Sequence, residues 1–443
     1  MAISFLPPDL ARQAVDRVLP VFASTPCHVA RNVIAMRFVR RLVLETAALR
    51  DSPLRDWPSL ACDEPAEPPE LRHAAIDLAR VNAHRPVEWI GAVHERILAA
   101  EVGPGRRQGS REPRGVRRRA GAFYTPPELV AHLLDRALEP VVEERLRRFD
   151  DPVAAVISIR LLDPSCGSGN FLLAAARRLA AHLVRRSSMT RSEAQALVVT
   201  SCIHGVDVDP VAVEACIGSL MLEAASPSLS RAVVAARIRH GDSLVGTLHG
   251  TDLRLPDAAQ VGADAPSRSV RDAWCAAMLG RGGEADAIAG DAILHWSEAF
   301  PHVFANGDAA AGFDVVVGNP PFLNQLERAT TLSRAREALI RAVSGGVGGS
   351  YTDLSATFLW RGVQLTAPGG RVAMVQPQSL LASRDAGPVR KAVASRASLE
   401  SIWVADEHVF EGASVYPCPC WPAPRSRWPW RRPTSGRTRR GTA

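Results

Sequence analysis

The stretch LLDPSCGSGNF, residues 161–171, decides the fold: a short apolar run is followed by a glycine-rich turn and by the first residues of a helical pattern. Glycines let the backbone approach a ligand closely, and the N–H groups at a helix start attract a carboxylate or phosphate. A Gly-x-Gly turn alone is weak evidence for a nucleotide-like ligand. Within the longer Asp-Pro-x-Cys-Gly-Ser-Gly-Asn-Phe sequence it becomes strong. We interpret Cys166 as a small residue that packs in the turn, not as a nucleophile.

Short β-rich runs alternate with helical patterns around this turn, from about residue 122 to residue 416. The predicted strands are 159–163, 202–207, 236–240, 313–317, 371–376 and 401–404, and the predicted helices are 126–147, 171–186, 210–225, 353–367 and 388–395. This alternation predicts an α/β fold, with a parallel sheet covered by helices on both faces. Residues of about 245–300, rich in Gly, Asp and Ala, are predicted to form an insertion at one edge of the sheet.

The segments outside this pattern differ from it in composition. Residues 1–102 mix apolar and charged residues at helical spacing, which predicts a helical accessory domain without chemistry of its own. Residues 103–121 form a linker with seven arginines, either a solvated loop or an arm that contacts phosphates. Residues 417–443 contain six prolines, seven arginines and three tryptophans, and they show neither helical nor strand periodicity. We predict that they form an aberrant, disordered tail after an incomplete last strand.

Composition and charge restrict the classes of function. The formal net charge of +7 suits a polyanionic partner. Lys391 is the only lysine, so an appended nuclease of the Asp…Glu-x-Lys kind is not expected. No apolar run approaches the roughly 18 residues that span a bilayer, and the start lacks a secretory signal. We therefore expect a cytoplasmic, nucleoid-associated protein. The eight cysteines lack the paired spacing of a zinc site, so we expect no metal.

Acidic residues follow the next two predicted strands. Asp207 ends the second strand, where an acid can accept hydrogen bonds from both hydroxyls of a ribose. Asp209 precedes Pro210 and is predicted to cap the following helix. Asp242 follows the third strand and is either a turn residue or an acceptor for the adenine amino group of a cofactor. Its place after two cofactor-like motifs favours the cofactor interpretation.

The segment FYTPPE, residues 123–128, precedes the glycine-rich turn by some 40 residues. Thr125 and Glu128 have the spacing of a capping box, with Pro126 at the first helical position. A capped helix start of this kind directs free N–H groups at an incoming carboxylate, such as the methionine end of S-adenosylmethionine.

The segment FDVVVGNPPF, residues 313–322, is the most specific feature of the chain, because a buried strand delivers Asn319-Pro320-Pro321-Phe322 to the carboxyl edge of the sheet. An exocyclic aromatic amine is a poor nucleophile, since its lone pair is delocalised into the ring. The Asn319 carboxamide oxygen and the Pro320 carbonyl can each accept one amino hydrogen. The prolines fix the turn, and Phe322 offers a stacking face for a base outside the duplex. Methyl transfer from a sulfonium then needs alignment and no metal.

Together these motifs resemble the gamma-type N6-adenine DNA methyltransferases of restriction–modification systems, of the fused type II or BREX-like kind. The family's order stands at 124–126, 163–171, 207, 241–242 and 319–322, and residues 295–301, HWSEAFP, look like its lead-in to the tetrapeptide. The resemblance implies a Rossmann-like sheet of seven strands that binds S-adenosylmethionine. It implies cofactor contacts from Tyr124, Thr125, Asp163, Cys166, Gly167, Gly169, Phe171, Asp207, Asp242 and Pro321. The catalytic segment would be Asn319, Pro320, Pro321 and Phe322, with the flipped adenine against Asn319, Pro320 and Phe322.

The implied partner is double-stranded DNA, with a separate specificity or defence-system subunit as a further candidate and no membrane. Family members continue into a target recognition domain, whereas this sequence changes near residue 417, so we expect a chain truncated before that domain. Other interpretations stay open. Methyltransferases of protein glutamine or ribosomal RNA guanine-N2 use similar tetrapeptides, and an inactive fragment could bind DNA or partner subunits. The tetrapeptide alone does not separate cytosine-N4 from adenine-N6, but the motif order favours adenine.

Overall fold

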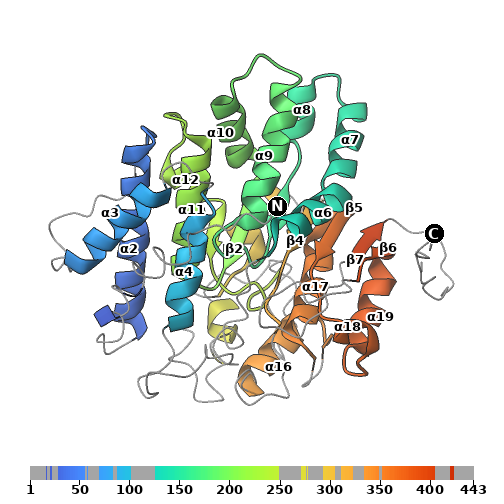
Figure 1. Cartoon of the computed structure of the whole chain (residues 1–443). Helices are drawn as coiled ribbons and strands as arrows, with labels where there is room; N and C mark the ends of the chain where they lie inside the picture. Colours follow the sequence, from blue (N-terminus) through green and yellow to red (C-terminus); the bar gives the residue numbers. More distant parts are fainter. Residues whose placement is uncertain are drawn as a thin grey trace, which may run out of the picture.

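A sheet of seven strands, in the order β3-β2-β1-β4-β5-β7-β6, organises the part of the chain that the computed structural model describes (Figure 1). That part comprises residues 28–54, 69–82, 87–100, 125–248, 271–275, 293–304, 311–322, 334–348, 352–404 and 420–423, with positions 16, 20, 21, 57 and 277. The strands are β1 (Leu161–Asp163), β2 (Ile203–Asp207), β3 (Ile238–His240), β4 (Phe313–Gly318), β5 (Thr366–Met374), β6 (Ser398–Ile402) and β7 (Cys420–Ala423). The predicted α/β fold is confirmed.

The strands β1 to β5 pair in parallel, so their carboxyl ends lie along one edge of the sheet. The chain begins in the middle with β1, runs outward to β3, and then returns to the other side of β1 with β4. Ligands bind at such a reversal of strand order in open α/β sheets. The reversal places the glycine-rich turn after β1 next to the segment after β4.

The strand β7 corrects the prediction for residues 417–443, which the sequence analysis treats as a disordered tail after an incomplete strand. Residues 420–423 instead run antiparallel between β5 and β6, with Met374 opposite Cys420 and Ser398 opposite Ala423. The facing edges of β5 and β6 present backbone N–H and C=O groups, which a short extended segment can pair with whatever its side-chain periodicity. The other residues predicted to form the tail lie outside the described part.

Helices cover both faces of the sheet, and strand residues alternate between two buried cores. Val315 and Val317 of β4 face the first core, whereas Phe313 and Val316 face the second. The first core lies under α6 (Pro127–Ala137), α7 (Glu139–Arg148), α8 (Pro152–Ile157), α9 (Asn170–Val184), α10 (Arg191–Ser201), α11 (Pro210–Ala224) and α12 (Arg231–Ala235). The second lies under α14 (Trp296–Ala299), α15 (Pro301–Phe304), α16 (Arg334–Val343), α17 (Leu354–Leu365), α18 (Ser379–Ala382) and α19 (Gly387–Arg396).

The single helix predicted over 126–147 is two helices that meet at Leu138. Pro140 is the cause, because proline has no N–H for the carbonyl four residues earlier and its ring clashes with that carbonyl. The break lets α6 lie against β4, β5 and α9 while α7 turns towards α8. No helix within the described ranges combines the length and the apolar character needed to cross a membrane.

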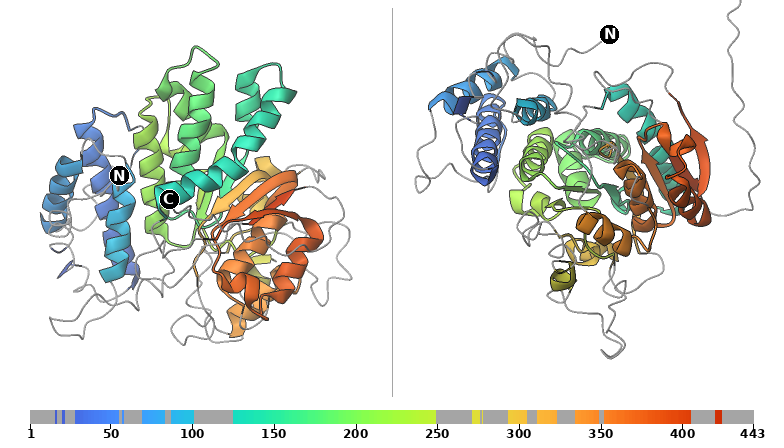
Figure 2. Two further views of the ribbon diagram at one scale, coloured as in Figure 1. Left: turned by 45° about the vertical axis from the view of Figure 1, so that its right-hand side comes forward. Right: turned by 90° about the horizontal axis from the view of Figure 1, so that it is seen from below.

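The amino-terminal helices α2 (His28–Leu49) and α4 (Trp89–Ala100) lie beside α11, and α3 (Pro69–Asn82) packs against α2 (Figures 1 and 2). Phe38 of α2 and Trp89 of α4 belong to the same buried core as Ile217 of α11. A Cβ atom added to Gly218 of α11 would lie 2.5 Å from a methyl carbon of Val43, so α2 and α11 are in close contact. These helices are therefore continuous with the core on one face of the sheet.

A pair of histidines, buried His204 and exposed His302, lies near the start of β2. His204 Nδ1 lies 3.2 Å from the Leu161 carbonyl oxygen, so Nδ1 has the proton, and Nε2 accepts from Arg237 Nη1 at 2.8 Å. His302 Nε2 is 2.8 Å from the same His204 nitrogen. Burial holds the pKa of His204 well below its ordinary value, and the charges of Arg237 and His302 lower it further.

This pair predicts a loss of stability in acid. The lowered pKa means that the unfolded chain binds a proton below about pH 6.5 that folded His204 does not bind. The free energy of unfolding should then fall by up to about 1.4 kcal/mol per pH unit from this residue. In urea unfolding at pH 7.5 and 5.5, His204→Asn should be less stable than wild type at pH 7.5 but should lose less stability on acidification. His73, exposed on α3, gives the matched control His73→Asn. An unchanged pH dependence in His204→Asn would contradict this assignment.

Candidate active site

Four strand ends meet at one edge of the sheet. Asp163, Asp207 and Asn319 lie at or directly after the carboxyl ends of β1, β2 and β4, and Asp242 follows β3. Two hydrogen bonds join the segments that follow these strands: Gly167 N donates to Asp207 Oδ2 at 2.8 Å, and the Ser243 hydroxyl donates to the Pro164 carbonyl at 2.6 Å. The structure thus brings together the motifs that the sequence spaces over some 150 residues.

The glycine-rich turn is closed on one side and open on the other. Gly167 and Gly169 both have positive φ, +53° and +97°. A Cβ atom on Gly169 would lie 2.7 Å from Cys216 Sγ of α11, whereas a Cβ on Gly167 would meet no atom of the described residues within 4 Å. Gly169 is the N-cap of α9, and no side chain caps that helix. The open side of the turn can therefore accept a ligand beside the N–H groups of the first helical turn.

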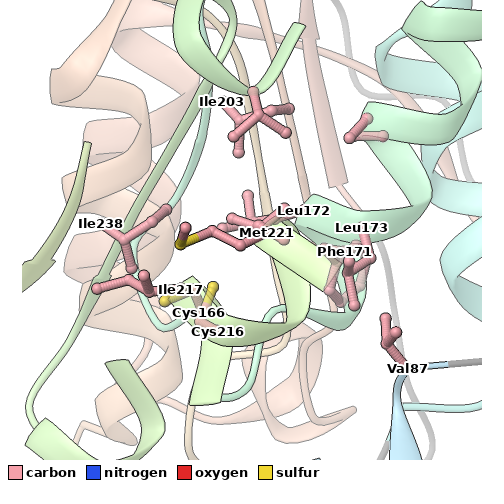
Figure 3. Close-up of a cluster of buried hydrophobic side chains, with 14 of the residues drawn as sticks. Val87, Cys166, Phe171, Leu172, Leu173, Ile203, Cys216, Ile217, Met221 and Ile238 are labelled. Carbon is pink, nitrogen blue, oxygen red and sulfur yellow. The ribbon is translucent and has the colours of Figure 1, made fainter. Parts of the chain in front are cut away.

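Cys166 and Phe171 anchor the turn from below. The sulfur atoms of Cys166 and Cys216 lie close together, and Phe171 lies near Val87 (Figure 3). A hydrogen bond with Cys216 and burial raise the pKa of the Cys166 thiol well above its usual value. The Cys166 thiol is therefore a packing group and a poor nucleophile. Contact of either residue with a cofactor stays a prediction.

Asp207 holds two turns together. Its Oδ2 accepts from Gly167 N, and its Oδ1 accepts from Asp209 N at 2.9 Å. Burial raises the pKa of Asp207 to about 6, against the opposing effect of these backbone hydrogen bonds. Asp209 caps α11 by accepting from Val211 N, which confirms its predicted role.

Asp163 is the most deeply buried acid of the site. Its side chain accepts a hydrogen bond from Ser165 N at 3.0 Å, yet burial raises its pKa to about 8. Asp207 adds to this rise through charge repulsion. A Cβ atom on Gly318 would lie 2.7 Å from Asp163 Oδ1, so the end of β4 passes directly against this carboxyl group. The first and last motifs are therefore in contact.

Thr125 contacts Asn319 directly, which corrects the predicted capping box. The helix α6 begins one residue later than expected, with Pro126 as its N-cap and no side-chain cap. Thr125 is buried, and its Oγ1 accepts a hydrogen bond from Asn319 Nδ2 at 3.0 Å. Two successive prolines at the helix start leave Thr125 before the N-cap, so its hydroxyl points to β4 instead. The bond fixes the orientation of the Asn319 carboxamide, so that its nitrogen faces Thr125 and its oxygen points away from Thr125.

Asp242 has a partner that the sequence analysis missed. Its Oδ2 accepts from Arg336 Nη2 of α16 at 2.5 Å, and its Oδ1 accepts from Leu244 N at 2.9 Å. The indole of Trp296, which is fully buried, donates to the Ser243 carbonyl at 3.3 Å. The HWSEAFP segment thus supports the turn at Asp242 from below, although it belongs to the predicted insertion.

The remaining predicted residues fall into two groups. Pro320 is buried, Pro321 and Phe322 are half-buried, and Phe322 packs against the first core. Tyr124 and the arginine-rich segment 103–121 lie outside the described residues. The contacts of Arg336 and His94 had no signal in the sequence, because a lone arginine or histidine on a helix indicates no partner. The capping-box spacing at Thr125 pointed to a local partner instead of Asn319.

Comparison with known proteins shows what this chain is similar to. The family model described as Eco57I restriction-modification methylase matches residues 201–410. The adenine-specific methyltransferase PglX of Streptomyces coelicolor is 26% identical over 254 residues, which are 56% of this chain and 18% of that protein. A Methanocaldococcus jannaschii protein, named for a type II restriction enzyme and methyltransferase, is 27% identical over 130 residues, 21% of this chain and 11% of that one. The chain thus spans less than a fifth of the length of these curated relatives.

Solved structures share the fold at low sequence identity. The type IIL restriction-modification enzyme MmeI in complex with DNA aligns with a TM-score of 0.54 and 13% identity, over 95% of this chain and 58% of that one. The DrdV–DNA complex aligns with a TM-score of 0.53 and 14% identity, over 94% of this chain and 38% of that one. At these identities the likeness establishes the fold.

Burial of Asp163 in the site is expected to lower the stability of the folded chain when its carboxyl group is ionised. Its folded pKa of about 8 lies above its ordinary 3.8, so its contribution to stability is lost as the pH rises through this interval. Asp163→Asn keeps the acceptor for Ser165 N and removes the charge. At pH 8 this variant should melt a few degrees above wild type, on the order of the shift for 1–2 kcal/mol, and the difference should vanish near pH 4. Thermal unfolding at both pH values tests this. A variant that melts below wild type at pH 8 would show that the carboxylate stabilises the fold.

Proposed function

We propose that the chain is an adenine-specific DNA methyltransferase, because residues 201–410 match the family model described as Eco57I restriction-modification methylase. It transfers a methyl group from S-adenosylmethionine to the N6 amino group of adenine in double-stranded DNA. The observation that supports this most directly is the Asn319 carboxamide, held by Thr125 beside the glycine-rich turn. The family match and the name of the Streptomyces relative supply the class of reaction.

The residues at the turn fit S-adenosylmethionine. Among the described residues nothing faces Gly167 and no side chain caps the start of α9, so the first N–H groups of this helix suit the carboxylate of the methionine end. Asn170 Oδ1 is a buried acceptor without a hydrogen-bond partner among the described residues, and it suits the cofactor's ammonium group. Asp207 suits the ribose hydroxyls, and Asp242 the adenine amino group. When bound, this cofactor supplies an electrophilic methyl group on a sulfonium.

The chain's own part in the reaction is to prepare the acceptor amine. The Asn319 oxygen and the Pro320 carbonyl accept the two amino hydrogens, which localises the nitrogen lone pair and directs it to the methyl group. The Thr125 hydroxyl oxygen accepts a hydrogen bond from the Asn319 amide N–H, so the carboxamide presents its oxygen to the base. The face of Phe322 stacks on the flipped adenine. Alignment of donor and acceptor accounts for much of the rate.

DNA is the proposed substrate because the motif order and the relatives both favour it. The net charge of +7 and the seven arginines of residues 103–121 suit contact with phosphates. A separate specificity or defence-system subunit is a further proposed partner. Protein glutamine, guanine-N2 of RNA and cytosine-N4 of DNA are competing acceptors, and the product distinguishes them.

The first test is the identity of the methylated product. Incubation with labelled S-adenosylmethionine and unmethylated DNA, followed by digestion, should give N6-methyladenine. Asn319→Ala should lower the rate at least about a hundredfold, because it removes an acceptor aligned with the transition state. Gln378→Ala changes an exposed amide on the same half of the sheet and should leave the rate unchanged. Label found only in protein, RNA or N4-methylcytosine would refute the adenine assignment.

The second test is the pH dependence of cofactor binding. Ribose hydroxyls donate to the ionised Asp207, whose pKa is about 6, so affinity should fall as the pH drops below that value. Titration calorimetry with S-adenosylhomocysteine between pH 5 and 8 should show this limb. Asp207→Asn should bind more weakly at pH 8 and show a flat profile over the same range. Asp150→Asn, at an exposed aspartate after α7, should behave as wild type.

A further inference from the structure

Three residues spaced three apart, one in the turn before α4 and two on α4 itself, contact three parts of the methyltransferase site. Glu88, Gly91 and His94 lie on one face, because positions three apart are neighbours on a helix. Their partners lie on α9, in the glycine-rich turn and in the turn between β2 and α11. The sequence analysis predicts an accessory domain without chemistry here, and these contacts connect it to the site.

The Glu88 contact fixes α4 against the helix that follows the glycine-rich turn. Arg177 of α9 donates to Glu88 and to Glu223 of α11, with Nη2 at 3.2 Å from Glu88 Oε2 and 2.7 Å from Glu223 Oε2. These side chains are largely shielded from solvent. One guanidinium therefore joins α4, α9 and α11 at a fixed spacing.

Gly91 brings the α4 backbone directly against the glycine-rich turn. A Cβ atom on Gly91 would lie 1.9 Å from Ser168 Oγ and 2.6 Å from Ser168 Cβ. The second distance cannot be relieved by rotating the serine hydroxyl, so any side chain at position 91 must displace the turn or the helix. Ser168 lies between Gly167 and Gly169, the two residues that shape the turn.

His94 continues into a chain of hydrogen bonds that ends on the same turn. His94 Nε2 contacts Asp209 Oδ2 at 2.8 Å, and both residues are largely buried. Asp209 N donates to Asp207 Oδ1 at 2.9 Å, and Asp207 Oδ2 accepts from Gly167 N at 2.8 Å. Any shift of Asp209 is therefore passed on to the proposed ribose acceptor and to the open side of the turn.

We propose that α4 is a wall of the cofactor site and that His94 is a positioning residue for S-adenosylmethionine. His94 does not touch the cofactor; it holds Asp209, and through it Asp207 and Gly167, in the geometry that binds the ribose. This inference rests on the proposed function for the identity of the ligand. The contacts of α4 with the two turns do not depend on that identity.

The test compares a variant that loses the hydrogen bond with one that keeps it. His94→Leu retains volume but cannot bond Asp209, and it should weaken S-adenosylhomocysteine binding about tenfold, the usual effect of losing a hydrogen bond to a charged group. His94→Gln places an amide nitrogen near the position of Nε2 and should bind within about threefold of wild type. His73→Leu, at an exposed histidine on α3, is the matched control.

A pH profile separates positioning from simple packing. Asp207 faces Asp163, Cys166 and Asp209, whose charges when ionised oppose its own, and His94, which lowers its pKa. Loss of His94 should therefore move the acid limb of the binding profile of His94→Leu to higher pH. His94→Gln also lacks the histidine's charge, so its acid limb should move in the same direction while its affinity at pH 8 stays close to that of wild type. Equal weakening in both variants with an unmoved profile would reduce His94 to a packing residue and overturn the proposal.

Hydrogen exchange gives a result that does not depend on the cofactor. Without ligand, peptides covering residues 165–169 should exchange faster in His94→Leu than in wild type, because the Gly167 amide loses its support. Gly91→Ala should have the same effect, and Gly91→Ala combined with Ser168→Gly should recover part of the protection. Unchanged exchange in all variants would overturn the proposal. Altered exchange together with no cofactor binding by wild type would instead refute the proposed function, while the contacts that couple α4 to the glycine-rich turn would stand.

Discussion

The hydrogen bond from Gly167 N–H to Asp207 joins the turn after β1 to the end of β2, and the rest of the site depends on it. A buried carboxylate is costly unless N–H groups compensate it, and in the described part of the chain Asp207 accepts from two backbone N–H groups. Its pKa of about 6 shows that compensation is incomplete. The Asp207 carboxylate can therefore accept further hydrogen bonds from the hydroxyl groups of a ligand. A ligand that donates them would also stabilise the folded chain.

Hydrogen bonds compensate the buried carboxyl group of Asp163 even less completely, because its pKa is raised to about 8. Asp163 lies where the end of β4 passes against β1. An uncompensated buried acid destabilises the folded chain, so a purely structural role would favour a neutral side chain at this position. Strain of this kind is typical of sites that bind or react. The proximity of Gly318 to Asp163 also means that the segment before Asn319 depends on how this carboxyl group is placed.

Much of the fold could be predicted from the sequence, because its signals are local. The short β-rich runs at β1, β2 and β4, the proline and aspartate at the start of α11, and the glycine-rich turn each identify their own element. Contacts between distant segments had no such signal. The bond between Thr125 and Asn319 joins residues 194 positions apart, and the spacing that suggested a capping box concealed it. The strand β7 was missed because backbone pairing, not side-chain periodicity, places it beside β5.

The amino-terminal helices show why domain boundaries drawn from composition can mislead. Their helical periodicity differs from the strand–helix alternation that follows, which suggested a separate unit. Yet Trp89 of α4 is buried in the same core as the sheet, and Gly91 leaves room for Ser168 only because it has no side chain. A helix that only covered the surface would tolerate a side chain at that position. The close approach of α4 to the glycine-rich turn therefore makes the shape of the cofactor site a property of both parts of the chain.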